Sequence, residues 1–288
     1  MGVEMNKNQV AGVVVLYNPE IDVFNNIMSY SNQVDKLFVF DNSDIMNDFF
    51  INKITGIENV IYYSENKNMG VGYAMNYGAC NARENGYKYL LTMDQDSFAC
   101  QDLVDKLMQA FSDRPNTGIA APFFQNKFST KTPPKEMYTE LFSSMTSGNL
   151  LDLAAYNKIG KFRDDYFIDY IDIEYCFRLK HKGYQIIQVN SVILDHNEAN
   201  ITRKHFLFRK IFPYNNAPVR FYYKTRNYFY FEKEYARIFP AEIRTERKFF
   251  LKNIIKMVLF EKKRVKKIKM IYAGFIDYKK NIKGRFAI

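Results

Sequence analysis

The sequence predicts an α/β protein with a mainly parallel central sheet and a basic, mainly helical extension at its C-terminus. Apolar runs rich in β-branched residues recur between residues 10 and 194, and segments with helical spacing separate them. Polar clusters follow several of these runs. Strands that alternate with helices form βαβ units, and parallel sheets of this kind bind ligands at the carboxyl ends of their strands.

The predicted elements follow one another in this alternating order. Strands are expected at 10–17, 37–40, 59–63, 87–93, 118–122 and 185–194. Helices are expected at 21–28, 51–57, 73–84, 103–111, 153–159 and 172–182. The stretch 123–145 contains two adjacent prolines and is predicted to be a long loop or a hairpin.

Composition indicates a folded globular protein. Hydrophobic residues make up 47% of the 288 residues and aromatic residues 17%, which argues against disorder. Cys80, Cys100 and Cys176 match neither a disulfide framework nor a zinc spacing, so we expect free thiols in a reducing cytoplasm. The polar stretch 4–9 argues against a secretory signal, and no apolar run reaches the length of a membrane span.

Charge divides the chain into two predicted domains. Residues 1–202 contain 17 Lys and Arg against 25 Asp and Glu, whereas residues 203–288 contain 24 against 6. The asymmetry predicts an acidic catalytic domain and a basic C-terminal region that meets an anionic partner. Nucleic acid and a membrane surface are the two candidates.

Asp94 and Asp96 follow the apolar run 87–93 with one residue between them. Two carboxylates at a strand end can hold a hard divalent cation such as Mg²⁺, which often also binds substrate phosphates. Acids at strand ends are also common in ordinary loops, so this pair needs support from other motifs.

Several further segments occur in a fixed order along residues 10–196. They are Val14-Val-Leu-Tyr-Asn18, Asp41-Asn-Ser43, Asn68-Met-Gly70 with Asn76, Asp94-Gln-Asp96, Ser147-Gly-Asn-Leu150 and Asp172-Ile-Glu-Tyr-Cys-Phe-Arg178. With them the chain resembles the family 2 glycosyltransferases of the Rossmann-like GT-A fold, an inverting class that uses nucleotide-sugar donors. Met93–Ser97 and Phe167–Glu174 most resemble bacterial rhamnosyltransferases of surface-polysaccharide biosynthesis.

The resemblance implies a set of donor-binding residues. Asp41 would accept the imide N–H of uracil or thymine, with Tyr17 against the base; an Asx-turn and rim packing are the alternative interpretations. Asp94 would face the ribose or act through water. The other donor residues implied are Asn18, Asn68, Gly70, Asn76 and Gln95. The segment 68–72 can also be a plain junction between loop and helix.

The resemblance also implies a metal site and a catalytic base. Asp96 and His196 would bind Mg²⁺ or Mn²⁺, although His196 can equally be a structural hydrogen-bonding residue. Asp172 would deprotonate the acceptor hydroxyl. Many relatives have Glu immediately before this Asp, where this chain has Ile171, so Asp169 and Glu174 are rival candidates.

A third group is predicted to bind the acceptor or a diphosphate. It comprises Ser147, Gly148, Asn149, Asp169, Arg220 and Arg226. The alternatives are a turn that precedes a helix at 147–149 and a solvated basic helix around the two arginines.

The segment 244–285 mixes large aliphatic residues with lysines, which favours an interfacial helix on anionic lipid. A nucleic-acid arm is less favoured, and no nucleic acid is expected as a partner; a helix packed on the body remains possible. The sequence therefore predicts a cytoplasmic enzyme at the inner membrane face that moves L-rhamnose from dTDP-rhamnose to a glycan on a lipid diphosphate. UDP-galactofuranose or a UDP-hexose as donor, and a non-catalytic scaffold, are the alternatives.

Overall fold

The computed structural model describes residues 9–126, 128–129, 131–196, 201–206 and 209–287. Contacts divide the chain into two compact units. The first comprises Met1–Asp164 and Ile171–Asn197, and the second comprises Asp165–Tyr170 and Glu198–Ile288. The second unit thus combines the C-terminal part of the chain with a short segment from its middle.

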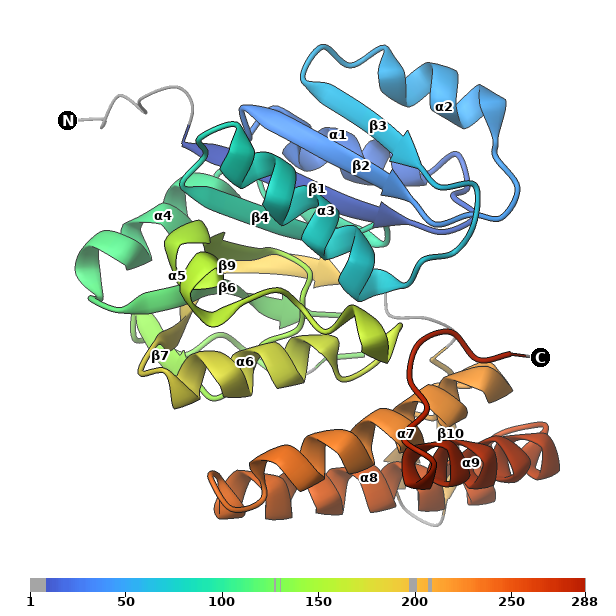
Figure 1. Cartoon of the computed structure of the whole chain (residues 1–288). Coiled ribbons are helices and arrows are strands. Elements are labelled where there is room, and N and C mark those ends of the chain that lie inside the picture. Colours follow the sequence, from blue (N-terminus) through green and yellow to red (C-terminus); the bar gives the residue numbers. More distant parts are fainter. Residues whose placement is uncertain (1–8, 127, 130, 197–200, 207–208, 288) are drawn as a thin grey trace. The chain divides into compact units, whose positions relative to one another are not determined.

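One mixed sheet forms the centre of the first unit (Figure 1). Within the described residues its strands run in the order β3-β2-β1-β4-β8-β6-β9-β5, and β7 pairs with β9. The strands are β1 (Val10–Leu16), β2 (Lys36–Asp41), β3 (Val60–Ser64), β4 (Tyr89–Asp94), β5 (Ser97–Ala99), β6 (Thr117–Gln125), β7 (Tyr138–Leu141), β8 (Asn149–Asp152) and β9 (Gln185–His196). Strands β3, β2, β1 and β4 are parallel neighbours, as are β6 and β9, so the predicted parallel core of the sheet is confirmed.

Three short strands were not predicted. β5 pairs antiparallel with β9, β7 also pairs antiparallel with β9, and β8 lies antiparallel between β4 and β6. The segment predicted as a loop or hairpin thus contains β7, and the predicted turn at 147–149 leads into β8. Each of these strands has three or four residues, too few for a two-residue alternation to be recognised in the sequence.

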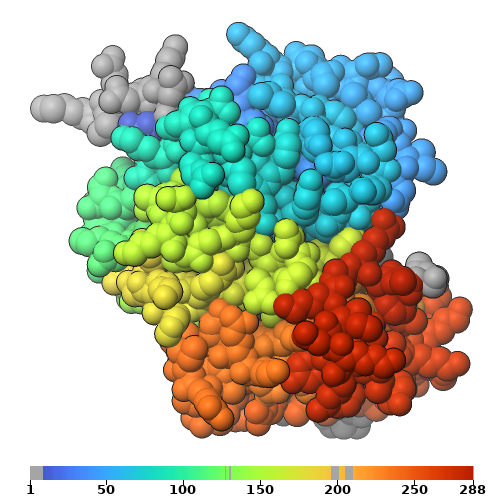
Figure 2. Space-filling view, in the orientation of Figure 1, coloured from blue at the N-terminus to red at the C-terminus, as the bar shows by residue number. Residues whose placement is uncertain are grey.

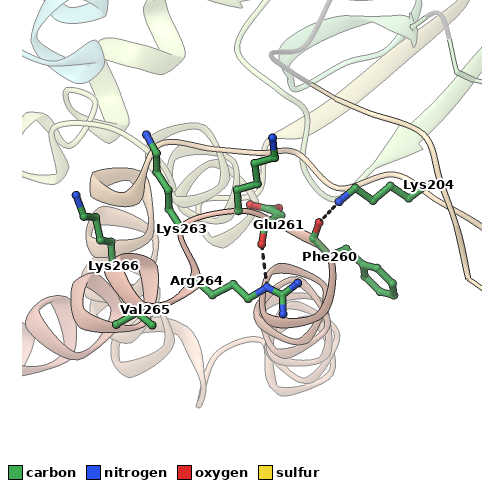
Figure 3. Close-up of a pocket in the computed structure, with 8 residues that line it drawn as sticks. Lys204, Phe260, Glu261, Lys263, Arg264, Val265 and Lys266 are labelled. Carbon is green, nitrogen blue, oxygen red and sulfur yellow. Dashed lines mark hydrogen bonds between the residues drawn. The ribbon is translucent and has the colours of Figure 1, made fainter.

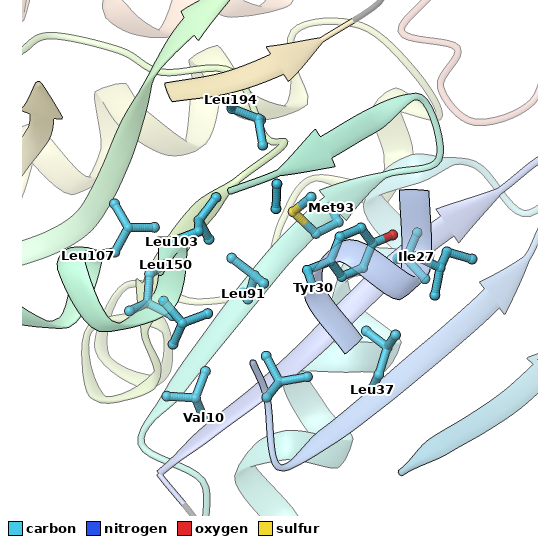
Figure 4. Close-up of a cluster of buried hydrophobic side chains, with 14 of the residues drawn as sticks. Val10, Ile27, Tyr30, Leu37, Leu91, Met93, Leu103, Leu107, Leu150 and Leu194 are labelled. Atoms are coloured by element: carbon cyan, nitrogen blue, oxygen red, sulfur yellow. The ribbon is translucent and has the colours of Figure 1, made fainter. Parts of the chain in front are cut away.

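Helices cover both faces of the sheet. They are α1 (Val23–Ser31), α2 (Asp48–Thr55), α3 (Val71–Glu84), α4 (Leu103–Asp113), α5 (Leu153–Ile159) and α6 (Ile171–His181), with a 3₁₀ turn at Asp164–Tyr166. Helices α1 and α4 share a buried cluster with β1 residues that include Val14. Val10 of the same strand is labelled in this cluster in Figure 4. The neighbouring residue Val13 faces α3, where Gly78 permits close contact: a Cβ at Gly78 would lie 2.4 Å from the Val13 Cβ.

The second unit is mainly helical, as predicted. It contains α7 (Pro218–Tyr235), α8 (Pro240–Phe260) and α9 (Arg264–Lys279), together with a hairpin of β10 (Lys204–Phe206) and β11 (Arg209–Ile211). Helix α9, red in Figure 2, packs on α7 through aromatic contacts such as Phe229–Phe275 and Tyr230–Tyr278. Within the described residues, no helix has the length and apolar character needed to span a bilayer.

Candidate active site

The strand ends that the sequence predicted to meet do lie at one edge of the sheet. Leu16 of β1 is in register with Asp41 of β2, and Val15 is in register with Asp94 of β4. Because β1 lies between β2 and β4, the carboxylates of Asp41 and Asp94 are on strands that flank the same central strand. This edge of the first unit therefore carries both Asp41, at the end of β2, and Asp94, at the end of β4.

Gln95 fixes the turn between Asp94 and Asp96. Its Oε1 accepts a hydrogen bond from the Tyr17 backbone N–H at 2.8 Å, and its Nε2 donates to the Tyr17 carbonyl at 3.2 Å. The Asn26 side chain donates to the Gln95 carbonyl at 2.8 Å. Gln95, one of the predicted donor residues, thus joins the turn to the end of β1. The ring of the neighbouring Tyr17 is about half exposed (48%) and can contact a base.

The predicted acceptor segment 147–149 supports this turn from inside the fold. Ser147 is fully buried; its Oγ accepts from the Asp94 N–H at 3.0 Å and donates to Ser97 Oγ at 2.7 Å. Gly148 has φ +74°, and a Cβ there would lie 2.7 Å from the Leu194 side chain. Asn149 is also buried and donates to the Met145 carbonyl at 2.6 Å. These contacts favour the alternative interpretation of a structural turn.

Asp41 lies in a buried cluster of hydrogen-bond donors. One carboxylate oxygen accepts from the Ser43 N–H (2.8 Å) and the Ser43 hydroxyl (2.5 Å), and the other accepts from the Tyr62 hydroxyl at 2.9 Å. Burial, followed by the bond to Asp41, raises the pKa of Tyr62 well above its ordinary value, so this hydroxyl stays a donor. The Asx-turn at Asp41 is therefore present. Tyr62, its partner on β3, was not predicted because it lies 21 residues away in the sequence.

The loop that precedes α3 is tied to the end of β2. The Asn42 side chain accepts from the Met69 N–H at 2.9 Å and donates to the Gly70 carbonyl at 3.3 Å. Asn68 Oδ1 accepts from the Gly70 N–H at 2.9 Å, and Gly70 takes φ +89°. The residue after Asn42, Ser43, accepts a hydrogen bond on its Oγ from the Asn18 N–H at 2.7 Å. Asn18, Asn68 and Gly70 thus all lie at the edge that carries Asp41.

The side chain of Asn76, one of the predicted donor residues, bonds to the protein backbone. It is buried on α3, where its Nδ2 donates to the Phe162 carbonyl at 2.9 Å and its Oδ1 accepts from the Phe162 N–H at 2.8 Å. The Tyr156 hydroxyl donates to the same Oδ1 at 2.9 Å. Gly72, one turn earlier, lies against the Arg163 carbonyl, 2.7 Å from where a Cβ would be. Asn76 and Gly72 therefore hold the 162–164 segment.

Two of the three candidate bases are held by arginines. Glu174 is fully buried and receives two bonds from Arg178, at 3.0 and 2.8 Å. In the second unit, Asp169 receives two bonds from Arg220, both at 2.7 Å. A bidentate arginine occupies both carboxylate oxygens with hydrogen bonds and fixes the orientation of the carboxylate. Asp172, half-buried in the first turn of α6 with an oxygen accepting from the Ile173 N–H, is the better candidate.

The second unit uses both predicted diphosphate-binding arginines internally. Arg220 forms the ion pair with Asp169 just described. Arg226 is completely buried, and its guanidinium donates to the carbonyls of Gly284 (2.7 Å) and Tyr166 (3.0 Å). The Arg220 side chain remains about a third exposed, whereas Arg226 is shielded from solvent.

The residues around Asp96 suit a hard cation. Asp94 and Asp96 are half-buried, and β5 pairs Ser97 with His196 of β9, so the backbone of His196 lies next to the acidic turn. The His196 side chain is outside the described part of the chain. Among the side chains that are described, no three His, Cys, Asp or Glu residues form a preassembled metal cluster. Two carboxylates match the oxygen ligands that Mg²⁺ and Mn²⁺ prefer.

Tyr30 is a residue of this region that the sequence did not single out. It is fully buried on α1 among the apolar side chains of the core (Figure 4). Burial, and then the negative charges of Asp94 and Asp96, raise the pKa of Tyr30 well above its ordinary value. Its hydroxyl therefore stays protonated close to both acids. Its spacing with Val23 and Ile27 resembles any core stripe, so the sequence carries no separate signal for it.

Comparison with known proteins adds a family match and several relatives. Residues 13–168 match the model of "Glycosyl transferase family 2". The chain is 28% identical over 243 residues to the dTDP-rhamnosyl transferase RfbF of Shigella flexneri, covering 78% of this chain and 80% of that protein.

Solved structures share the fold at low identity. Residues 1–349 of S. aureus TarS in complex with UDP-GlcNAc give a TM-score of 0.58 at 14% identity, covering 95% of this chain and 81% of that one. GalNAc-T7 with UDP, GalNAc and Mn²⁺ gives 0.55 at 11% identity, covering 88% and 58%. For a longer TarS structure, with a TM-score of 0.57 at 14% identity, the match covers 88% of this chain and only 44% of the other.

Proposed function

Because the chain belongs to glycosyl transferase family 2 and is a glycosyltransferase of the GT-A fold, we propose that it transfers L-rhamnose from dTDP-rhamnose with inversion. One observation carries the proposal: β1 sets Asp41 and Asp94 on flanking strands at one sheet edge, so that a nucleotide can reach from one carboxylate to the other. The sugar and the thymine base are inferred from the rhamnosyl transferase relative.

In this proposal each residue of the edge has a separate task. Asp41, held by Ser43 and Tyr62, accepts the imide N–H of the base. Asp172 takes the proton from the acceptor hydroxyl while the oxygen of that hydroxyl bonds to the anomeric carbon. The bond from the anomeric carbon to the diphosphate breaks in the same step, and dTDP leaves. Asp96, with Asp94 and His196, would hold Mg²⁺ or Mn²⁺, which when bound supplies positive charge to the leaving diphosphate.

We further propose an acceptor on a lipid diphosphate at a cytoplasmic membrane face. Helix α8 exposes Leu251, Ile255 and Leu259 at a spacing of four, and α9 exposes Val265, Ile268 and Tyr272 at a spacing of three and four. Each set forms one apolar ridge along its helix. Apolar ridges with lysines beside them favour an interfacial position on lipid.

The turn between α8 and α9 adds positive charge to these ridges (Figure 3). A pocket of about 460 Å³ there is lined by Lys204, Phe260, Glu261, Lys262, Lys263, Arg264, Val265 and Lys266. Glu261 is neutralised by a buried ion pair with Lys267 at 2.6 Å, so the lining is strongly cationic. Such a surface complements anionic phospholipid headgroups.

The activity test is transfer from a panel of nucleotide sugars by the wild type and by Asp172→Asn. We expect the wild type to use dTDP-rhamnose in preference to UDP-galactofuranose and UDP-hexoses. The variant should lose about 10²- to 10⁴-fold in kcat, because it lacks the base, while calorimetry shows nearly unchanged donor binding. Asp105→Asn, an exposed acid on α4, is the control. Wild-type turnover by Asp172→Asn would contradict the assignment of the base, and preference for a uridine donor would contradict that of the substrate.

A further inference from the structure

The loop Asp165–Tyr170, which leads into α6, has an unusual backbone. Phe167, Asp169 and Tyr170 have φ of +66°, +67° and +66°, in the left-handed region that residues with a Cβ rarely adopt. The loop contains no glycine that would make such angles easy. Several strained residues in so short a segment persist only where surrounding contacts hold them.

Helix α7 provides those contacts from its polar side chains. The Asn227 amide is fully buried and donates to three loop carbonyls: Tyr166 at 2.9 Å, Ile168 at 2.8 Å and Asp169 at 3.0 Å. The buried Arg226 guanidinium donates to the Tyr166 carbonyl at 3.0 Å and to the Asp165 carbonyl at 3.3 Å. These bonds fix the backbone of almost the whole loop.

Other side chains of α7 hold the loop's side chains. Arg220 forms its bidentate ion pair with the Asp169 carboxylate. Tyr223 stacks on Phe167 with ring centroids 5.0 Å apart. Positions 220, 223 and 227 are separated by three and four residues, so they lie on one face of the helix. A single face of α7 therefore grips both the backbone and the side chains of 165–170.

The loop passes directly into the helix that carries the assigned base. Tyr170 is followed by Ile171, the first residue of α6, and Asp172 lies in the first turn. Few backbone torsions separate the carbonyl of Asp169, which Asn227 holds, from the Asp172 side chain. A change in the left-handed angles at 169 and 170 would therefore redirect the start of α6.

We propose that Asn227 and Arg226 are positioning residues: by clamping the 165–170 loop, they hold the backbone that leads into the first turn of α6 and so the direction of Asp172. The proposal rests on Asp172 as the base of the proposed function. It gives α7 a part in catalysis through the backbone of this loop. It also accounts for an arginine and an asparagine that are both completely buried.

The test compares Asn227→Ala with Asn190→Ala in the full-length protein. Asn190 is a matched control, since it is also buried and its Nδ2 donates to the Glu136 carbonyl at 2.8 Å in the first unit. For Asn227→Ala we expect kcat to fall about tenfold to a hundredfold, as small misplacements of a catalytic group do. The donor KM and the Kd for dTDP should change less than about twofold. Hydrogen exchange should rise in residues 165–174. Asn190→Ala should keep kcat per folded molecule.

A loss of activity in proportion to the folded fraction, or an unchanged kcat with a loosened loop, would overturn the proposal. Asn227→Ser, which keeps a polar side chain of smaller size, provides the same comparison if Asn227→Ala does not fold. The variant Asp172→Asn distinguishes a failure of the clamp proposal from a failure of the assignment of Asp172 as the base. If Asp172→Asn is inactive and the Asn227 variants keep kcat, only the clamp is wrong; if Asp172→Asn is fully active, the base assignment fails first.

Discussion

Asp94 and Asp96 lie in a turn that neighbouring side chains hold by hydrogen bonds. Gln95 joins the turn to Tyr17, and the buried Ser147 hydroxyl accepts a hydrogen bond from the Asp94 N–H. A turn fixed at both ends would keep the two carboxylates at a set separation for the cation that we propose they bind. Pre-organisation of this kind lowers the ordering cost of binding.

Substitution of Asp96 tests the metal proposal at the residue scale. Asp96→Asn keeps the size of the side chain and removes its charge, so we expect transfer to fall about 10²- to 10³-fold and to respond weakly to added Mn²⁺. The measurement is initial rate against Mn²⁺ and Mg²⁺ concentration. Asp102→Asn is the control, since this acid is exposed and pairs with Lys106. A rate and metal response equal to those of the wild type would reject Asp96 as a ligand.

Residue types were easier to predict from the sequence than residue partners. Asp41, Asp94, Asp96 and Asp172 stand in recognisable positions because strand ends and a helix start are visible as local patterns. Asn76 has the same kind of signal, yet its amide is used by the Phe162 backbone, 86 residues away. Arg226 similarly resembled a ligand-binding arginine and is buried against carbonyls. Such partners depend on tertiary contacts that no local pattern records.

At the scale of elements, the packing of α3 on β1 sets the geometry of the donor edge. Helix α3 begins at the loop that Asn42 holds, and its Gly78 lies directly on Val13 of β1. The close approach lets the first turn of α3 reach the 163–164 backbone through Gly72. Helix α3 therefore links β1, the central strand of the proposed donor edge, to the 163–164 segment, which precedes the proposed base in the chain.

Gly78→Ala should destabilise the first unit. Its Cβ would lie 2.4 to 3.0 Å from three atoms of the Val13 side chain, and the packed core leaves little room for adjustment. We expect a loss of about 1–3 kcal/mol in the free energy of unfolding, as for overpacking in general. Urea denaturation measures it. Gly56→Ala is the control, because Gly56 has φ −71° and its nearest contact would be at 3.4 Å. Equal stability of the two variants would show that α3 can shift away from β1.

The sequence predicted the long elements and missed the short ones for a physical reason. Strands such as β1 are buried on both faces, so they appear as continuous apolar runs. β5, β7 and β8 are short and pair antiparallel with distant strands; their stability comes from those partners. Pairings over such distances leave no local periodicity to detect.

At the scale of the whole molecule, charge is distributed unevenly along the chain. The excess of Lys and Arg lies in the C-terminal region, and there the structure exposes apolar residues on α8 and α9 among the lysines. Basic residues attract an anionic surface over about a Debye length, and apolar side chains act only after contact. The two kinds of residue therefore predict different responses to salt.

Vesicle binding separates these contributions. We expect the protein to sediment with phosphatidylglycerol vesicles and far less with phosphatidylcholine vesicles, and binding should weaken as salt rises from about 0.1 M to about 0.5 M. Replacing Leu251 and Ile255 together by Ser should weaken binding about tenfold or more, since two exposed aliphatic side chains no longer enter the interface. Ile45→Ser is the control, because Ile45 is 83% exposed in the first unit. Binding to duplex DNA with no preference for anionic vesicles would contradict the membrane proposal and favour a nucleic-acid partner.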